Sequence, residues 1–193
     1  MRTCRYIFVV GSYLAIFCFS ARANEVFKFD PARSTIAFHV RHMLGTARGK
    51  FTKFSGTIEF DREHPENSSV IATIRTGSID TAIAKRDEHL RGADFFNVQK
   101  FPEITFRSRQ LRQTGPNSGD IVGDLTMHGV TRSITLKVKL VEGSDRQTQR
   151  WRVTTAPISR REFGLAWSKS IEAVSMIGDE VAVEIEIEAS RAQ

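Results

Sequence analysis

Beyond residue 23 the sequence contains no cysteine and no tyrosine, because every residue of either type lies before that point. The absence of cysteine excludes a disulfide framework, thiol chemistry and any metal site built from thiolates. Of the 193 residues in the chain, 170 follow position 23. A chain of that length suits one domain and can bury roughly 70% of its unfolded surface, so it needs no disulfide or metal to fold.

The first 23 residues are typical of an export signal. Two arginines among the first five residues precede an apolar core over residues 6–20, and residues 21–23 place alanine at both positions that a signal peptidase reads. The apolar core is shorter than the ~20 residues of a spanning helix. We expect cleavage after Ala23, a mature domain over residues 24–193 and a periplasmic location. A lipoprotein signal using Cys18 is the alternative.

Positive charge is nearly balanced beyond this signal. The signal holds three of the 28 basic residues, which leaves 25 against 22 acidic ones and a net charge of +3. So small and dispersed an excess predicts no nucleic-acid partner. Short basic stripes such as Lys137 with Lys139 are by default solvated outer faces, and attraction to an anionic membrane surface is the alternative.

Apolar and polar residues alternate over most of the chain from residue 25 onward, which is typical of half-buried strands. In the clearest stretch, Val181, Val183 and Ile185 face one way while the glutamates near them face the other. About eight or nine such runs, joined by short polar turns and without an internal repeat, predict an antiparallel β-barrel or a sandwich.

One segment, residues 78–102, lacks this alternation and predicts a helix. Ile83, Asp87 and Leu90 fall on one helical face, which we expect to point inward. A carboxylate on that face needs a partner, and an arginine from elsewhere, such as Arg161, is our expectation.

The ends of this helix carry their own signals. Asp80 or Thr81 can cap its start, and Gly92 can end it. Phe95 and Phe96 follow on a short connecting turn. Because adjacent aromatic side chains are unfavourable in water, we expect them to cover an apolar opening.

Two histidines lie three positions apart in "STIAFHVRHML". A strand over residues 35–42 places them on opposite faces of the sheet, so they cannot chelate one metal from a regular strand. His39 is predicted to lie at the surface. His42 ends the apolar face; it is either a partly buried residue bonded to a neighbouring loop or a hydrogen-bond donor at the mouth of a pocket.

The remaining histidines give little support for a metal site. His64 lies in a turn, His89 on the predicted helix and His128 at a hairpin turn, and none belongs to a close-spaced ligand motif. No nucleophile elbow is present, and "GTARGK" lacks the ending of a phosphate-binding loop. We therefore predict no catalytic residue and no metal ligand.

Several stretches together resemble the YceI-like family of exported, polyisoprenoid-binding proteins. One departure is Arg33, where the family often has histidine. The matching stretches occur in the family's order: "FDPARSTIAFHVRHMLGTARGKFTKFSGTIEFD", "SIDTAIAKRDEHLRGADFFNVQKFPEITFRS", "GDLTMHGVTRSITLKV", "ISRREFGL" and "GDEVAVEIEIEA".

The resemblance implies an all-β fold, an eight-stranded antiparallel lipocalin-like barrel with a short helical insertion that encloses an elongated apolar channel. It implies an amphiphilic lipid as partner, either a polyisoprenoid or a quinone-type molecule, with no required cofactor and no catalytic residues. Family members are often dimeric, which implies a homodimer.

If the barrel holds a prenyl or acyl chain in a tunnel, the inward residues of the strands should contact that chain. We expect His42 and Arg161 to meet the ligand head group. The tunnel wall is expected to comprise Ile36, Phe38, Val40, Ile58, Phe60, Ile104, Phe106, Val181, Val183 and Ile185, with Leu90, Phe95 and Phe96 as its cap.

Three functions stay open on the sequence. The first is a carrier or store for a long-chain lipid. The second is an enzyme acting on such a lipid, which requires a polar cluster inside the barrel. The third is a β domain for interaction with other proteins, which predicts a solid core.

Overall fold

The computed structural model of the protein describes residues 25–42, 45–141, 145–166 and 177–192. The expected export signal and its cleavage site lie outside the described residues. The helical elements are α1 (Ala84–Arg91), η1 (Pro65–Asn67), η2 (Thr76–Ser78) and η3 (Arg161–Phe163). The strands are β1 (Glu25–Phe29), β2 (Thr35–His42), β3 (Gly45–Phe51), β4 (Phe54–Phe60), β5 (Ser69–Arg75), β6 (Ile79–Asp80), β7 (Glu103–Gly115), β8 (Ser118–Met127), β9 (Val130–Leu140), β10 (Thr148–Thr155), β11 (Ile158–Ser159) and β12 (Glu180–Arg191).

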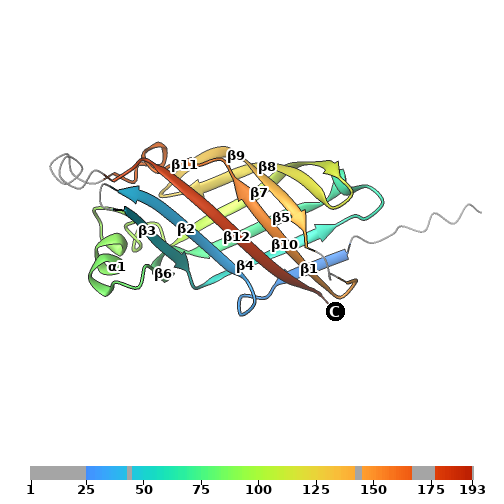
Figure 1. Cartoon of the computed structure of the whole chain (residues 1–193), viewed down its shortest axis with the longest axis horizontal. Helices are drawn as coiled ribbons and strands as arrows, with labels where there is room; N and C mark the ends of the chain where they lie inside the picture. Colours follow the sequence, from blue (N-terminus) through green and yellow to red (C-terminus); the bar gives the residue numbers. More distant parts are fainter. Residues whose placement is uncertain (1–24, 43–44, 142–144, 167–176, 193) are drawn as a thin grey trace, which may run out of the picture.

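The strands close into an eight-stranded antiparallel barrel (Figure 1). Hydrogen-bonded pairing runs in the order β1, β4, β5, β7, β8, β9, β10 and β12, and the last strand returns to the first by pairing Phe27 with Arg191. Closure removes free sheet edges and encloses an interior. The predicted fold class is confirmed.

The barrel wall continues past β1 toward α1. There β2 pairs with β12, β3 pairs with β2, and the short β6 pairs with β3. Between β3 and β4 the main-chain bonds persist across the break: Thr52 N–H donates to Ser78 O at 3.1 Å and Arg75 N–H donates to Lys53 O at 2.9 Å. The two strands therefore act as one long, bent wall element.

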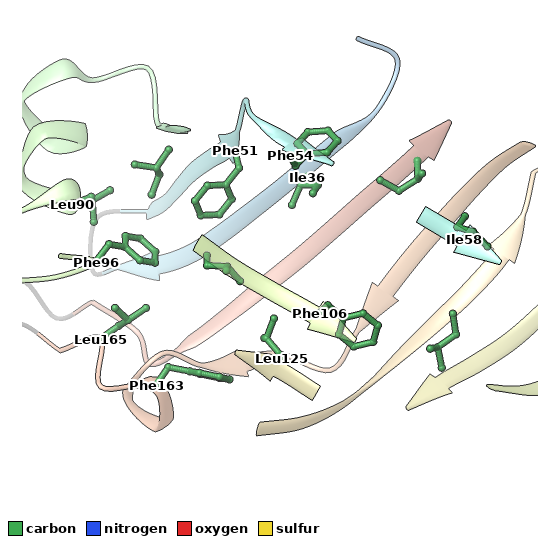
Figure 2. Packing of buried hydrophobic residues seen from close by; sticks show 14 of the residues in the cluster. Ile36, Phe51, Phe54, Ile58, Leu90, Phe96, Phe106, Leu125, Phe163 and Leu165 are labelled. Carbon is green, nitrogen blue, oxygen red and sulfur yellow. The ribbon is translucent and has the colours of Figure 1, made fainter. Parts of the chain in front are cut away.

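Inward residues of neighbouring strands meet in rows across the barrel. Phe38 pairs with Val183 on one side and with Gly49 on the other. A second row contains Val153, Ile185, Ile36, Phe51 and Ile79, each paired with the next. Because side chains alternate along a strand, these pairings fix which residues face the interior. Figure 2 shows part of the resulting apolar layer, from Leu90 and Phe96 at one end to Ile58 at the other.

The helix differs from its prediction at its start and agrees at its end. It begins at Ala84, after Ile83 in extended conformation, and no side chain caps it. Asp80 instead accepts a bond from Ala82 N–H at 2.9 Å, which shapes the preceding turn. Because Ile83 precedes the helix, its side chain is 51% exposed and the inward position predicted for it is wrong. Gly92 ends the helix as expected.

Arg33, where the sequence departs from the family pattern, binds the outside of β12. Its Nη1 lies 2.9 Å from Glu188 Oε1, and Arg150 Nε lies 3.2 Å from the other oxygen of the same carboxylate. The bond to Glu188 raises the pKa of the Arg33 guanidinium above its ordinary value. Arg33 thus fastens the β1–β2 connection to the barrel wall.

Candidate functional site

The barrel encloses a cavity of about 500 Å³. Apolar side chains supply nearly all of its lining, and they come from inward positions of the strands together with α1 and the segment that follows it. Sites for small organic molecules typically have volumes of this order and a similar apolar character. The interior is therefore not a solid core, and it can accept an apolar ligand.

Two glycines allow phenyl rings to lie flat against the wall. A Cβ atom on Gly49 would lie 2.5 Å from Cζ of Phe38, and one on Gly56 would lie 2.3 Å from Cε2 of Phe29. Both rings border the cavity. Because each glycine leaves room for a ring against the main chain, the centre of the barrel stays open.

A cluster of aromatic rings stands at the α1 end. Phe95 and Phe96 are both buried, and their ring centroids are 5.2 Å apart in an edge-to-face arrangement. Phe96 also meets Phe51 of β3 at 6.1 Å. Leu90 of α1 borders the same end of the cavity. The segment after the helix therefore forms an apolar cover, as its sequence predicts.

The structure brings the predicted wall and cap residues together around one space. All of them border the cavity: Ile36, Phe38, Val40, Ile58, Phe60, Leu90, Phe95, Phe96, Ile104, Phe106, Val181, Val183 and Ile185. The alternation of β2 and β12 was sufficient to choose the correct faces. That these residues contact a lipid stays a prediction.

The two histidines of β2 lie on opposite faces. His39 is on the outside, with Nε2 3.2 Å from Glu184 Oε1. His42 is half-buried and borders the cavity. This geometry excludes a metal site shared by the two histidines, and the contact of His42 with a ligand head group stays a prediction.

Arg161 does not border the cavity, so the structure gives no support to its predicted contact with the head group. The side chain is exposed, and its Nε lies 4.0 Å from Asp179 Oδ1. Its neighbour Arg160 borders the cavity instead and is 3% exposed. The Arg160 guanidinium donates to three main-chain carbonyls at 2.7 to 3.3 Å, those of Leu165, Ile177 and Gly178.

The pairing expected between Asp87 and Arg161 is also wrong. Asp87 Oδ1 accepts from the main-chain N–H of Thr81 at 2.9 Å and from the Thr81 hydroxyl. These bonds compensate the buried carboxylate locally. The carboxylate therefore fixes the turn before α1.

Sequence reasoning missed two polar residues at this end, Thr81 and Arg86, which both border the cavity. Arg86 Nε donates to Thr81 Oγ1 at 2.8 Å, and Arg86 Nη2 donates to Thr81 O at 2.9 Å. A usable signal existed, since Arg86 precedes the buried Leu90 by four residues and so shares its helical face. The charged neighbours of Arg86 hid this signal.

Within the described ranges, no group of three His, Cys, Asp or Glu side chains is placed to hold a metal ion. In the same residues, no helix is long and apolar enough to cross a membrane.

Comparison with known proteins identifies the family. The family model for the YceI-like domain matches residues 27–189, which include the whole barrel core. The chain belongs to the YceI-like family. A UPF0312 protein of Pseudomonas aeruginosa is 38% identical over 134 residues, 67% of this chain and 70% of that protein. Protein YceI of Escherichia coli O157:H7 is 42% identical over 111 residues, 57% of this chain and 58% of that protein.

Solved YceI-like structures share the fold. BcnA of Burkholderia cenocepacia superposes with a TM-score of 0.77 at 26% identity, covering 84% of this chain and 99% of that one. A polyisoprenoid binding domain from Saccharophagus degradans gives a TM-score of 0.66 at 18% identity, with 86% and 98% of the two chains covered. The YceI-like barrel is thus kept at low sequence identity.

Proposed function

We propose that this YceI-like protein is an exported lipid-binding protein that holds a long-chain isoprenoid or similar amphiphile in its barrel for transport or storage. The observation that carries the proposal is the cavity of about 500 Å³ with its almost wholly apolar lining. Each methylene kept from water is worth ~0.8 kcal/mol. A chain of many methylenes therefore gains strongly by entering such a space.

A solved structure with the same fold is consistent with a lipid ligand. The S. degradans domain, which has the same fold, is described as polyisoprenoid binding. Its low identity to this chain carries the fold alone, so the ligand class rests here on the cavity.

The expected cleavable signal supports export, and a periplasmic carrier is the form of the proposal that follows from it. Such a carrier must exchange its cargo with a membrane. Ile83, exposed beside Lys85 at the α1 end, supports a transient membrane contact there, because apolar insertion and basic charge act together at anionic surfaces. A homodimer stays a prediction from the family resemblance.

Extraction of the purified protein with organic solvent, followed by mass spectrometry, tests the proposal. We expect a long-chain amphiphile in near-stoichiometric amount, and no chemical change when that lipid is incubated with the protein. Turnover of the lipid would favour the enzyme alternative. A protein that is empty after export and takes up no long-chain amphiphile would favour the interaction domain.

A matched pair of variants on β2 tests whether the lipid lies inside the barrel. Phe38→Asp places a carboxylate on the cavity wall, where desolvation is unfavourable, so we expect lipid retention to be lost. His39→Ala alters the outer face and should retain the lipid. Equal losses in both variants would contradict an internal site.

A further inference from the structure

Arg86 is a basic residue at the border of a cavity whose lining is almost wholly apolar. The residue is half-buried on α1 and borders the cavity close to Thr81. A guanidinium carries five N–H donors and keeps its charge at all ordinary pH values. The two bonds to Thr81 use one donor of Nε and one of Nη2. Within the residues that the structure describes, both hydrogens of Nη1 and one of Nη2 have no acceptor.

The arrangement holds Arg86 in place without neutralising it. Among the described residues, no carboxylate oxygen lies within ion-pair distance of Arg86. Asp87 acts one step away, since it accepts from the Thr81 hydroxyl, whose oxygen in turn accepts from Arg86 Nε. This chain of bonds fixes the guanidinium plane. It leaves the edge that can grip an oxyanion with two parallel hydrogen bonds.

The buried arginine nearby shows the contrast. Arg160 also borders the cavity, but main-chain carbonyls occupy its three nitrogen atoms. The guanidinium of Arg160 therefore binds the protein's own main chain. Arg86, by contrast, keeps three N–H donors that no described residue occupies.

We propose that Arg86 anchors an oxyanion head group, a carboxylate or a phosphate, of the amphiphile whose tail fills the cavity. The inference rests on the proposed lipid-binding function and deepens it by naming the head-group chemistry and the orientation. The head group lies at the α1 end against Nη1 and Nη2 of Arg86, and the tail runs toward β1 and the C-terminal end of β12.

Fluorescence titration with cis-parinaric acid and its methyl ester tests this anchor. The two probes share one tail, and at pH 8 only the acid carries a charge. The wild-type protein should bind the acid about tenfold more tightly than the ester, as expected for a charge-assisted bond. Arg86→Gln should lose that factor for the acid while its affinity for the ester changes less than twofold.

Lys85→Gln is the matched control, because it removes the same charge from an exposed neighbour that does not border the cavity, and the titration contains no membrane for Lys85 to contact. It should leave both affinities unchanged. Arg86→Lys should retain part of the preference for the acid, since it keeps the charge but not the paired donors. Farnesyl monophosphate and farnesol as competitors repeat the comparison with a phosphate head and show which oxyanion is preferred.

Equal affinity of the wild-type protein for each charged probe and its neutral partner would overturn the anchor, and this test requires no variant to fold. Equal loss of acid and ester binding in a folded Arg86→Gln would also overturn it, because that pattern reflects a general structural role. Failure of every long-chain probe to bind would instead contradict the proposed function itself.

Discussion

The two ends of the cavity differ in chemistry although one barrel wall encloses both. At the α1 end, polar side chains border the space, among them Thr81, Arg86 and His42. At the opposite end, the lining comes from large apolar side chains such as Phe60 and Trp151, whose ring centroids are 6.0 Å apart. Figure 1 places α1 and the C-terminal end of β12 toward opposite ends of the barrel. The cavity is therefore polarised along its length.

This difference explains why the site suits an amphiphile better than a hydrocarbon. Ser68 is a polar residue of the far end, and its hydroxyl already accepts a bond from Asp61 N–H at 2.9 Å. A free polar head group would find few partners there, and burying it unpaired would be unfavourable. At the α1 end, by contrast, Arg86 offers fixed donors.

The largest effect is expected from a charge at the apolar end. Val138→Asp places a carboxylate on the cavity wall of β9, and we expect the affinity for a long-chain probe to fall by more than about a hundredfold because the tail would displace water from that carboxylate. Lys139→Asp changes the adjacent outward residue and should leave the affinity unchanged. Probe titration of both variants measures the difference. Equal affinities would contradict binding of the probe inside the barrel.

A second prediction concerns the α1 end of the cavity, where a side chain of the cover can be shortened. Leu90 of α1 is 7% exposed. Leu90→Ala should lower the free energy of unfolding by roughly 2–3 kcal/mol and speed probe dissociation, because it loosens the cover at the α1 end. His89→Ala, on the exposed side of the same helix, is its control. Urea denaturation and stopped-flow release measure both quantities; unchanged release would show that α1 does not limit exit.

A smaller loss of stability should follow when the phenyl ring of Phe38 is displaced from its place against the main chain of Gly49. Gly49→Ala places a methyl group against Phe38, so the ring must turn toward the centre of the cavity. We expect a loss of ~1–3 kcal/mol in the free energy of unfolding. Longer probes should also lose more affinity than shorter ones, and a loss independent of probe length would contradict the role of Gly49 in keeping the space open.

The smallest effect concerns a loop outside the cavity. Main-chain N–H donors of His64 and Glu63 lower the pKa of Asp61 below its ordinary value of 3.8. Since the folded pKa is the lower one, this stabilisation is present above pH 3.8 and is lost as pH falls through the folded pKa. Asp61→Asn should therefore flatten the fall of Tm below pH 3.8, with probe affinity at pH 7 unchanged; a wild-type slope below pH 3.8 in the variant would contradict this role of Asp61.

The sequence predicted the wall of the site well because a strand has a strict period of two. Once β2 and β12 are recognised, the inward positions of Phe38 and Val183 follow without any knowledge of tertiary contacts. Closure of the barrel is different, because β1 and β12 lie at opposite ends of the chain. The residues left a barrel and a sandwich open, and only the family resemblance indicated a closed barrel; which strands close it was not predicted.

The polar end of the site was harder to predict for a local reason. Arg160 and Arg161 are adjacent, and a single turn at η3 buries the first and exposes the second. No periodic pattern extends over so short an element. Ile83 was misplaced because the left-handed Ala82, with φ of 61°, delays the start of α1. Turn geometry, rather than side-chain hydrophobicity, decided both cases.

Quenching of Trp151 by brominated fatty acids tests most directly that the cavity holds a tail with its head at the α1 end. Trp151 borders the cavity and is paired with Ile187 on the neighbouring strand β12. Trp167→Phe leaves Trp151 as the sole tryptophan of the chain. A fatty acid brominated near its methyl end should quench Trp151 saturably and strongly, whereas one brominated beside the carboxylate should quench it weakly. Absence of saturable quenching by either acid, or stronger quenching by the second, would contradict this arrangement.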